Sequence, residues 1–337
     1  MECMKACVFR PLCALALAVL SCVAAVPARA GDPVTITVGA KFGAFYGLAH
    51  EMVYDQTNPI PNYENSELVW ALEPMVFSGA ALSLDSRLGL FATLDVRQGF
   101  AAKAGTMTDS DFLNGDGVRT HFSQSDSEAE RANIVDLKAG WDFYRVSALK
   151  IGAFVELSYL DFKWSARDGY LQYPTQSSPP FTPWSPDETK TPIYGTGILY
   201  ETAWMGLALG VHSRYQFAHG FSVEGSFAFT PLLRCSTEDN HVFRQLDFFS
   251  TLSGGFMIEP RVAVEYVPFK GGVLRLEIGY RYTWGMKGDL TEVSTGTTDV
   301  TSGYPYYAGP NSALTGTGDS GASLSLLDAS LGLSISL

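Results

Sequence analysis

The chain is acidic and rich in residues that favour β-strands. It has 337 residues, a formal net charge of −12, 13% aromatic residues and 33 glycines. This length suits one large domain, and the aromatic and glycine content is typical of strands joined by tight turns rather than of a helical bundle. The negative charge argues against a nucleic-acid partner and favours basic partners.

The N-terminus is predicted to be an export signal. Two positive charges precede an apolar run over residues 12–26, and small residues at 28–30 offer a cleavage site. A lipoprotein signal with its lipid on Cys22 is the alternative. We expect residues 1–30 to be a signal peptide and residues 31–337 to form one domain, whose formal charge would be −14 because three positive charges and one negative charge leave.

No membrane-spanning helix is predicted for the mature chain. Beyond residue 30 no apolar stretch is long enough to span a bilayer as a helix, so a membrane location requires a closed β-barrel. Cys235 would be the one cysteine left, which excludes an internal disulfide and suggests a buried thiol.

Alternation of apolar and polar residues predicts ten antiparallel strands. The first strand alternates over 34–38 and the last over 331–337, so a chain that begins and ends in such strands can close on itself. An even strand number is usual for bacterial barrels. We expect strands near residues 34–48, 64–79, 82–103, 130–145, 148–170, 192–216, 220–236, 242–267, 272–290 and 321–337.

The joins between these strands alternate in length, which predicts sidedness. Short joins are expected near 80–82, 145–148, 217–220 and 268–272, and mostly longer ones near 48–64, 104–130, 170–192, 236–242 and 290–320. Short turns on the periplasmic rim and long extracellular loops are typical of outer-membrane barrels. The alternative, a soluble lipocalin-like barrel or a sandwich, would usually have shorter strands.

Two polar segments are expected on the same rim. Asp109 and Asp111 follow the third strand, and Asp239 and His241 follow the seventh. Both strands are odd-numbered, so both segments should face the cell exterior. Two close carboxylates tend to share a proton, an Asp beside a His can orient the imidazole, and a water between the pairs would be a plausible nucleophile.

The order of several segments along the chain resembles the omptin family. Gly105–Leu113 resembles the family motif that carries paired aspartates, and Asp239–His241 resembles its Asp-x-His dyad. Further similar segments, in the family's order, are His50–Tyr54, Ser66–Trp70, Asn133–Trp141 and Tyr159–Tyr170.

The resemblance implies an aspartic-type endopeptidase of the outer membrane that cuts exposed peptides or proteins beside basic residues. Asp239 and His241 would activate water, and Asp109 and Asp111 would lie opposite. Neither a metal nor another cofactor is implied, and neither a zinc-protease motif nor a serine nucleophile elbow occurs.

The same resemblance assigns substrate-binding positions. Glu51 matches the acidic base of the pocket for the residue before the cut. Met107 and Thr237 are expected beside the substrate.

Some acidic positions of the family are missing here. Thr237 stands where the family has a second pocket acid, although Glu238 is adjacent, and a third acidic subsite falls near Thr120. Fewer acids should weaken the selection for Arg or Lys.

The family's requirement for lipopolysaccharide is also expected to be weaker. The positions that match its basic wall residues are Ser158 and Ala203, while Phe154 and Glu156 resemble the remaining wall residues. Phosphate recognition without Arg or Lys is poor. Membrane lipid remains an expected partner of the wall.

Two other functions are compatible with the same barrel. A non-catalytic omptin-like barrel could serve as an adhesin or surface scaffold, and a diffusion pore is disfavoured because small barrels fill their lumen with side chains. Proteolysis requires Asp109, Asp111, Asp239 and His241 to converge on one gap, whereas an adhesin does not.

Overall fold

The computed structural model describes residues 34–55, 57–217, 220–294 and 316–336. The predicted export signal and the segment 295–315 of the last predicted loop lie outside the described residues. Within these ranges, no helix has the length and apolar character needed to cross a membrane.

The described chain consists almost entirely of antiparallel strands. The strands are β1 Thr35–Asp55, β2 Tyr63–Asp85, β3 Leu90–Gly99, β4 Ala102–Asp111, β5 His121–Val146, β6 Leu149–Gln172, β7 Thr191–Gln216, β8 Phe221–His241, β9 Leu246–Ser253, β10 Phe256–Phe269, β11 Gly272–Trp284, β12 Met286–Ser294 and β13 Gly316–Ser336. A single 3₁₀ turn, η2 (Val242–Arg244), is described between β8 and β9.

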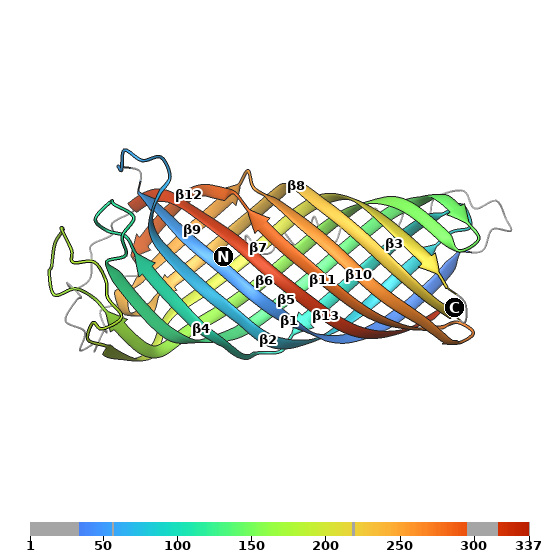
Figure 1. The fold of residues 1–337 in the computed structure, drawn as a ribbon, viewed down its shortest axis with the longest axis horizontal. Helices are drawn as coiled ribbons and strands as arrows, with labels where there is room; N and C mark the ends of the chain where they lie inside the picture. Colours follow the sequence, from blue (N-terminus) through green and yellow to red (C-terminus); the bar gives the residue numbers. More distant parts are fainter. Residues whose placement is uncertain (1–33, 56, 218–219, 295–315, 337) are drawn as a thin grey trace.

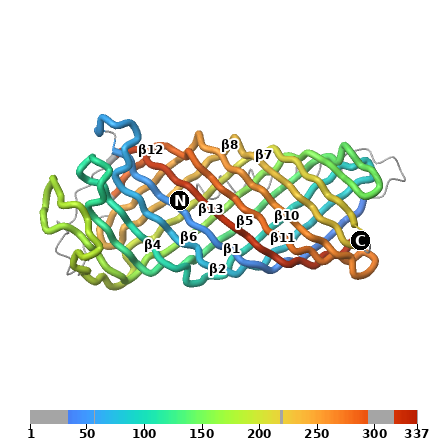
Figure 2. Tube along the Cα trace, in the orientation of Figure 1, coloured from blue at the N-terminus to red at the C-terminus, as the bar shows by residue number. Residues whose placement is uncertain are grey.

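These segments close into a ring of ten strand positions (Figure 1). Three positions are interrupted strands, namely β3 with β4, β10 with β9, and β11 with β12. The ring is sealed by β1, which pairs with β13 from Thr37 opposite Ser336 to Tyr54 opposite Asp319. The tube traces of these two strands run side by side along the molecule (Figure 2). The predicted ten-stranded antiparallel barrel is therefore confirmed.

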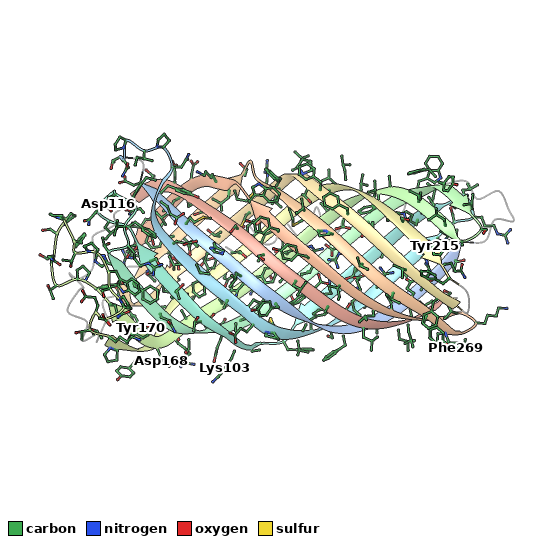
Figure 3. The ribbon with its side chains drawn as sticks, in the orientation of Figure 1. Lys103, Asp116, Asp168, Tyr170, Tyr215 and Phe269 are labelled. Atoms are coloured by element: carbon green, nitrogen blue, oxygen red, sulfur yellow. The ribbon has the colours of Figure 1, made fainter. Side chains whose placement is uncertain are left out.

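Long and short connections lie at opposite ends, as expected from the sequence. Asp116 and Asp168 are found at the end with the longer loops, and Tyr215 and Phe269 at the end with the short turns (Figure 3). The turn predicted at 80–82 was wrong, because β2 continues to Asp85 and the chain reverses at 86–89, where Gly89 has a φ of +87°.

The outer ends of several strands are longer than their apolar pattern suggested. Asp109 and Asp111 lie within β4 and Asp239 and His241 within β8, not in the loops predicted to follow these strands. The alternation that marks a lipid-facing strand fades in these polar extensions, although their backbone hydrogen bonding continues.

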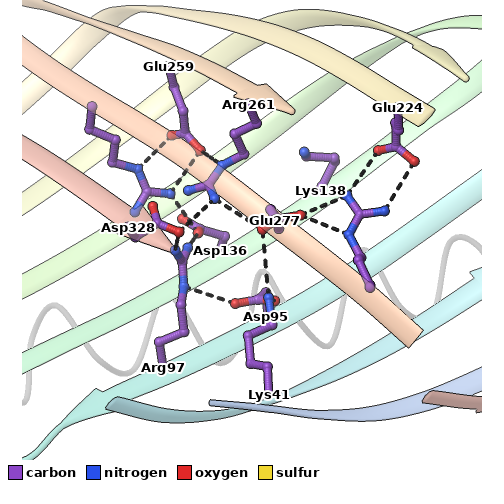
Figure 4. Close-up of polar contacts among 12 residues, drawn as sticks. Lys41, Asp95, Arg97, Asp136, Lys138, Glu224, Glu259, Arg261, Glu277 and Asp328 are labelled. Carbon is purple, nitrogen blue, oxygen red and sulfur yellow. Dashed lines mark hydrogen bonds and ion pairs between the residues drawn. The ribbon is translucent and has the colours of Figure 1, made fainter. Parts of the chain in front are cut away.

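The barrel wall is apolar outside and the lumen is polar in the half nearer the short turns. Exposed large apolar side chains run from Ile36 to Leu48 on β1 and from Phe221 to Leu232 on β8. Inside, Arg281 lies 2.6 Å from both Asp136 and Glu259. These two carboxylates belong to a layer of ion pairs in the lumen that also includes Arg97 and Arg261 (Figure 4). An apolar exterior around a polar interior is the pattern of an outer-membrane barrel.

The other half of the lumen is packed with aromatic and aliphatic side chains. Trp70 stacks on Tyr200 with ring centroids 5.3 Å apart, and Trp164 lies 6.1 Å from Tyr200. Cys235 is buried in this same cluster, as expected. The cluster forms a largely apolar layer between the ionic layer and the outer rim.

One expectation about the outer wall was wrong. Phe154, Glu156 and Ser158 are buried with their side chains inside the barrel, whereas Val155 is 47% exposed on the outside. A one-residue error in register moves every side chain of a strand to the opposite face. Ala203, between buried Thr202 and Trp204, does face outward.

Candidate active site

A cleft of about 650 Å³ opens inside the outer end of the barrel. Its lining includes six of the seven residues singled out from the sequence, which are Glu51, Met107, Asp109, Asp111, Asp239 and His241. Strands β1, β4 and β8 carry these six residues, and they lie beyond the apolar belt of the wall. The two distant polar segments are thus brought into one cleft, as predicted.

The first pair of residues is contributed by the end of β8. Strand alternation places Asp239 and His241 on the same inner face, and His241 Nε2 lies 2.7 Å from Asp239 Oδ2. Phe248 on β9 meets the imidazole edge-on, with ring centroids 5.2 Å apart. Asp239 is almost fully buried, so the carboxylate holds the ring in one orientation.

The second pair depends on a bulge in β4. Ala104 and Met107 are both buried, although strict alternation would put residues three apart on opposite faces. The register against β5 shifts between Lys103 and Thr106, and Gly105 has a φ of +87°. The bulge at Gly105 therefore rotates Asp109 and the residues in phase with it toward the cleft.

Both aspartates are shifted toward the protonated form. Burial raises the pKa of Asp109 well above its usual value, with further contributions from the charges of Asp111 and Asp239. Burial also raises the pKa of Asp111. Ser66 Oγ donates a hydrogen bond to Asp109 Oδ1 at 3.4 Å. The pair is therefore suited to holding a proton beside the dyad.

Glu51 adds a carboxylate to the cleft from β1. It is opposite Leu68 of β2, which is in turn opposite Asp109 of β4, so Glu51 and Asp109 share one row of the sheet. Burial is the main cause that raises the pKa of Glu51 well above its usual value, and the negative charges of Asp239 and Asp109 raise it further. Among the described residues, Glu51 Oε2 and Asp239 Oδ1 are buried without a hydrogen-bond partner.

Of the two further positions expected beside the substrate, Met107 and Thr237, only one lies at the cleft. Met107 lines the cleft, but Thr237 does not, since it is buried on β8 two residues nearer the membrane than Asp239. Glu238 alternates to the outer face and cannot replace the missing pocket acid. Thr120 is also buried, where its hydroxyl donates to the Asp111 carbonyl oxygen at 3.1 Å.

The cleft also contains charged residues that the sequence did not single out. Asp55 and Glu292 add two carboxylates, and Arg244 adds a guanidinium. Arg244 stands three residues after His241, a spacing that suggests proximity only once the tight η2 turn is known. Within the described residues, no group of three or more His, Cys, Asp or Glu side chains is arranged to hold a metal ion.

Two known proteins resemble this chain, one in its fold and one in its sequence. The crystal structure of outer membrane protease OmpT from Escherichia coli has a TM-score of 0.78 at 16% identity and covers 90% of this chain and 97% of that chain. The plasminogen activator of Yersinia pestis is 25% identical over 297 residues, 82% of this chain and 90% of that protein.

The fold defines the class of protein as an outer-membrane β-barrel. The sequence profile of the Omptin family matches residues 32–313. The chain belongs to this family of outer-membrane proteases, and its location is the outer membrane. The family resemblance and the location expected from the sequence are confirmed.

Proposed function

We propose that this chain is an endopeptidase in which Asp239 and His241 activate water, opposite Asp109 and Asp111, to cut a peptide bond next to a basic residue. The observation that carries the proposal is the meeting of both pairs in one cleft of about 650 Å³. The ion-pair distance of 2.7 Å between His241 and Asp239 supports an oriented base.

The proposed reaction needs one base and one shared proton. The imidazole nitrogen facing away from Asp239 takes a proton from water, and the water oxygen bonds to the scissile carbonyl carbon. The aspartate pair donates a hydrogen bond to the carbonyl oxygen as it becomes negative. When the C–N bond breaks, the proton on His241 passes to the leaving amine, while Asp239 stays ionised and stabilises the imidazolium.

The charge of the cleft supports a basic substrate. Six carboxylates and a single Lys or Arg side chain are found among the described lining residues. The carboxylates are Glu51, Asp55, Asp109, Asp111, Asp239 and Glu292. The unpartnered oxygens of Glu51 and Asp239 would gain a charge-assisted hydrogen bond from a substrate guanidinium or ammonium.

A weak dependence on lipopolysaccharide also belongs to the proposal, although the support from Ser158 is lost. Two outward cations on the wall near Ala203, Arg131 and Lys163, are already paired. Arg131 lies 2.7 Å from Asp161, and Lys163 lies 3.2 Å from Glu201. A guanidinium or ammonium that is neutralised by a neighbouring carboxylate is a poor site for a lipid phosphate.

The test is cleavage of an Arg-containing reporter peptide by the full chain in detergent, with and without added lipopolysaccharide. His241→Ala should lower kcat by about 10²–10⁴-fold. His50→Ala is the matched control, because His50 pairs with Glu67 on the outer face of the barrel. Equal turnover by wild type and His241→Ala would contradict the role of His241 as the base. No turnover by wild type under either condition would leave a non-catalytic surface scaffold as the function, and strict lipid dependence would contradict the lipid proposal.

A further inference from the structure

Arg244 is a resident cation beside the proposed base. The tight turn η2 ends at Arg244, and Gln245 in the left-handed conformation (φ +54°) returns the chain to β9. The guanidinium lies 5.9 Å from the centre of the Phe248 ring, and Arg244 Nη1 lies 3.5 Å from His241 Nδ1. The only Lys or Arg among the described cleft residues therefore contacts the imidazole itself.

The contact engages the one imidazole nitrogen that could act as a base. His241 Nε2 is committed to Asp239 at 2.7 Å. Arg244 has only N–H donors, so its contact uses the lone pair of Nδ1. A nitrogen whose lone pair accepts a hydrogen bond from a guanidinium is hindered from taking a proton from water.

We propose that Arg244 shields the base nitrogen of His241 in the substrate-free site and is displaced when the cationic side chain of a substrate enters the cleft. The inference rests on the proposed function and adds to it a coupling between substrate charge and base availability. Displacement costs little, because the Arg244 side chain is exposed and the 3.5 Å contact is long.

The charges of the cleft give the displacement its selectivity. The resident guanidinium and an incoming one would share the same six carboxylates, so the second cation weakens the hold on the first. A neutral side chain exerts no such repulsion and leaves Arg244 over Nδ1. Basic peptides would therefore free the base, whereas neutral peptides would meet a shielded one.

The rate at which diethyl pyrocarbonate acylates His241 measures how well Arg244 shields the imidazole, and it does not require catalysis. An imidazole nitrogen with a free lone pair attacks a carbonyl carbon of the reagent and becomes carbethoxylated, with release of ethanol and carbon dioxide. Peptide mass spectrometry compares His241 with His50 in the same molecule. Arg244→Gln should raise the His241 rate about fivefold, whereas Arg244→Lys should restore part of the protection. Arg119→Gln is the matched control, since Arg119 packs against Phe122 and Trp184 outside the cleft.

Cleavage kinetics test whether a cationic substrate side chain displaces Arg244. The measured quantity is the ratio of kcat/KM for an arginine peptide to that for the same peptide with citrulline. Arg244→Gln should lower this ratio about fivefold, chiefly by raising kcat for the citrulline peptide, and Arg119→Gln should leave the ratio unchanged.

The outcomes separate the two proposals. Unchanged acylation of His241 in Arg244→Gln overturns the shield, and increased acylation with an unchanged ratio overturns its displacement by substrate. If the wild type cuts neither peptide, and acylation of His241 still increases in Arg244→Gln, the proposed protease is overturned and the shielding contact is supported.

Discussion

The two polar regions of the lumen use the same residue types in opposite ways. In the layer near the short turns, each of Asp136, Glu259 and Asp328 has a guanidinium partner, as Figure 4 shows. In the cleft at the outer rim, Glu51 Oε2 is buried without a hydrogen-bond partner within the described chain, and Asp239 is paired with the imidazole of His241 instead of a guanidinium. Carboxylates paired with guanidinium groups stabilise the barrel, whereas a buried carboxylate without such a partner, like Glu51, has an oxygen that a cationic ligand could satisfy.

The largest effect should follow from breaking the paired layer. Arg281 is fully buried and contacts Asp136 and Glu259, so Arg281→Met leaves two carboxylates without that partner. We expect a loss of about 3–5 kcal/mol in the free energy of unfolding, measured by urea titration in lipid vesicles. A variant as stable as wild type would show that the layer is not held by its ion pairs.

A smaller effect is expected from the bulge that aims the aspartates. At Gly105 an added Cβ would meet the Glu73 side chain at 2.8 Å in a left-handed backbone conformation. Gly105→Ala should cost about 1–3 kcal/mol of stability and lower kcat, because Asp109 and Asp111 lose their alignment. Gly225→Ala on β8 is the matched control, since a Cβ there meets nothing within 4 Å. Full activity in Gly105→Ala would contradict the role of the bulge.

The smallest effect distinguishes the two regions by sign. The pKa of Asp109 is raised in the folded protein, so its contribution to stability is fully present below the ordinary aspartate value of 3.8 and is lost as pH rises through the folded pKa. Asp109→Asn should therefore be more stable than wild type at neutral pH, and the two should converge in acid.

The matched variant in the paired layer should do the opposite. Asp136→Asn removes a partner of Arg281 and should lower stability at neutral pH. Urea midpoints of both variants measured against pH check the comparison. A loss of stability in Asp109→Asn at neutral pH would show that the cleft carboxylates are structural.

Much of the arrangement could be predicted from the chain. Alternation and loop lengths predicted the ring, and strand parity placed Asp109 and Asp239 on one rim. The bulge at Gly105 was not predictable in the same way, because alternation alone would turn Asp109 outward. The sequence also could not place Ser158, whose face depends on register, or Arg244, which reaches His241 only through the turn between β8 and β9.

The catalytic candidates are mounted on paired strands rather than on the connections between them. The strand that carries Asp109 pairs with β2 on one side and β5 on the other, and the strand that carries Asp239 pairs with β7 and β9. The rim loop 173–190 can thus change in length or composition without moving the proposed catalytic groups. A change in that loop alone would alter which peptides reach the cleft, while the four side chains beneath it keep their positions.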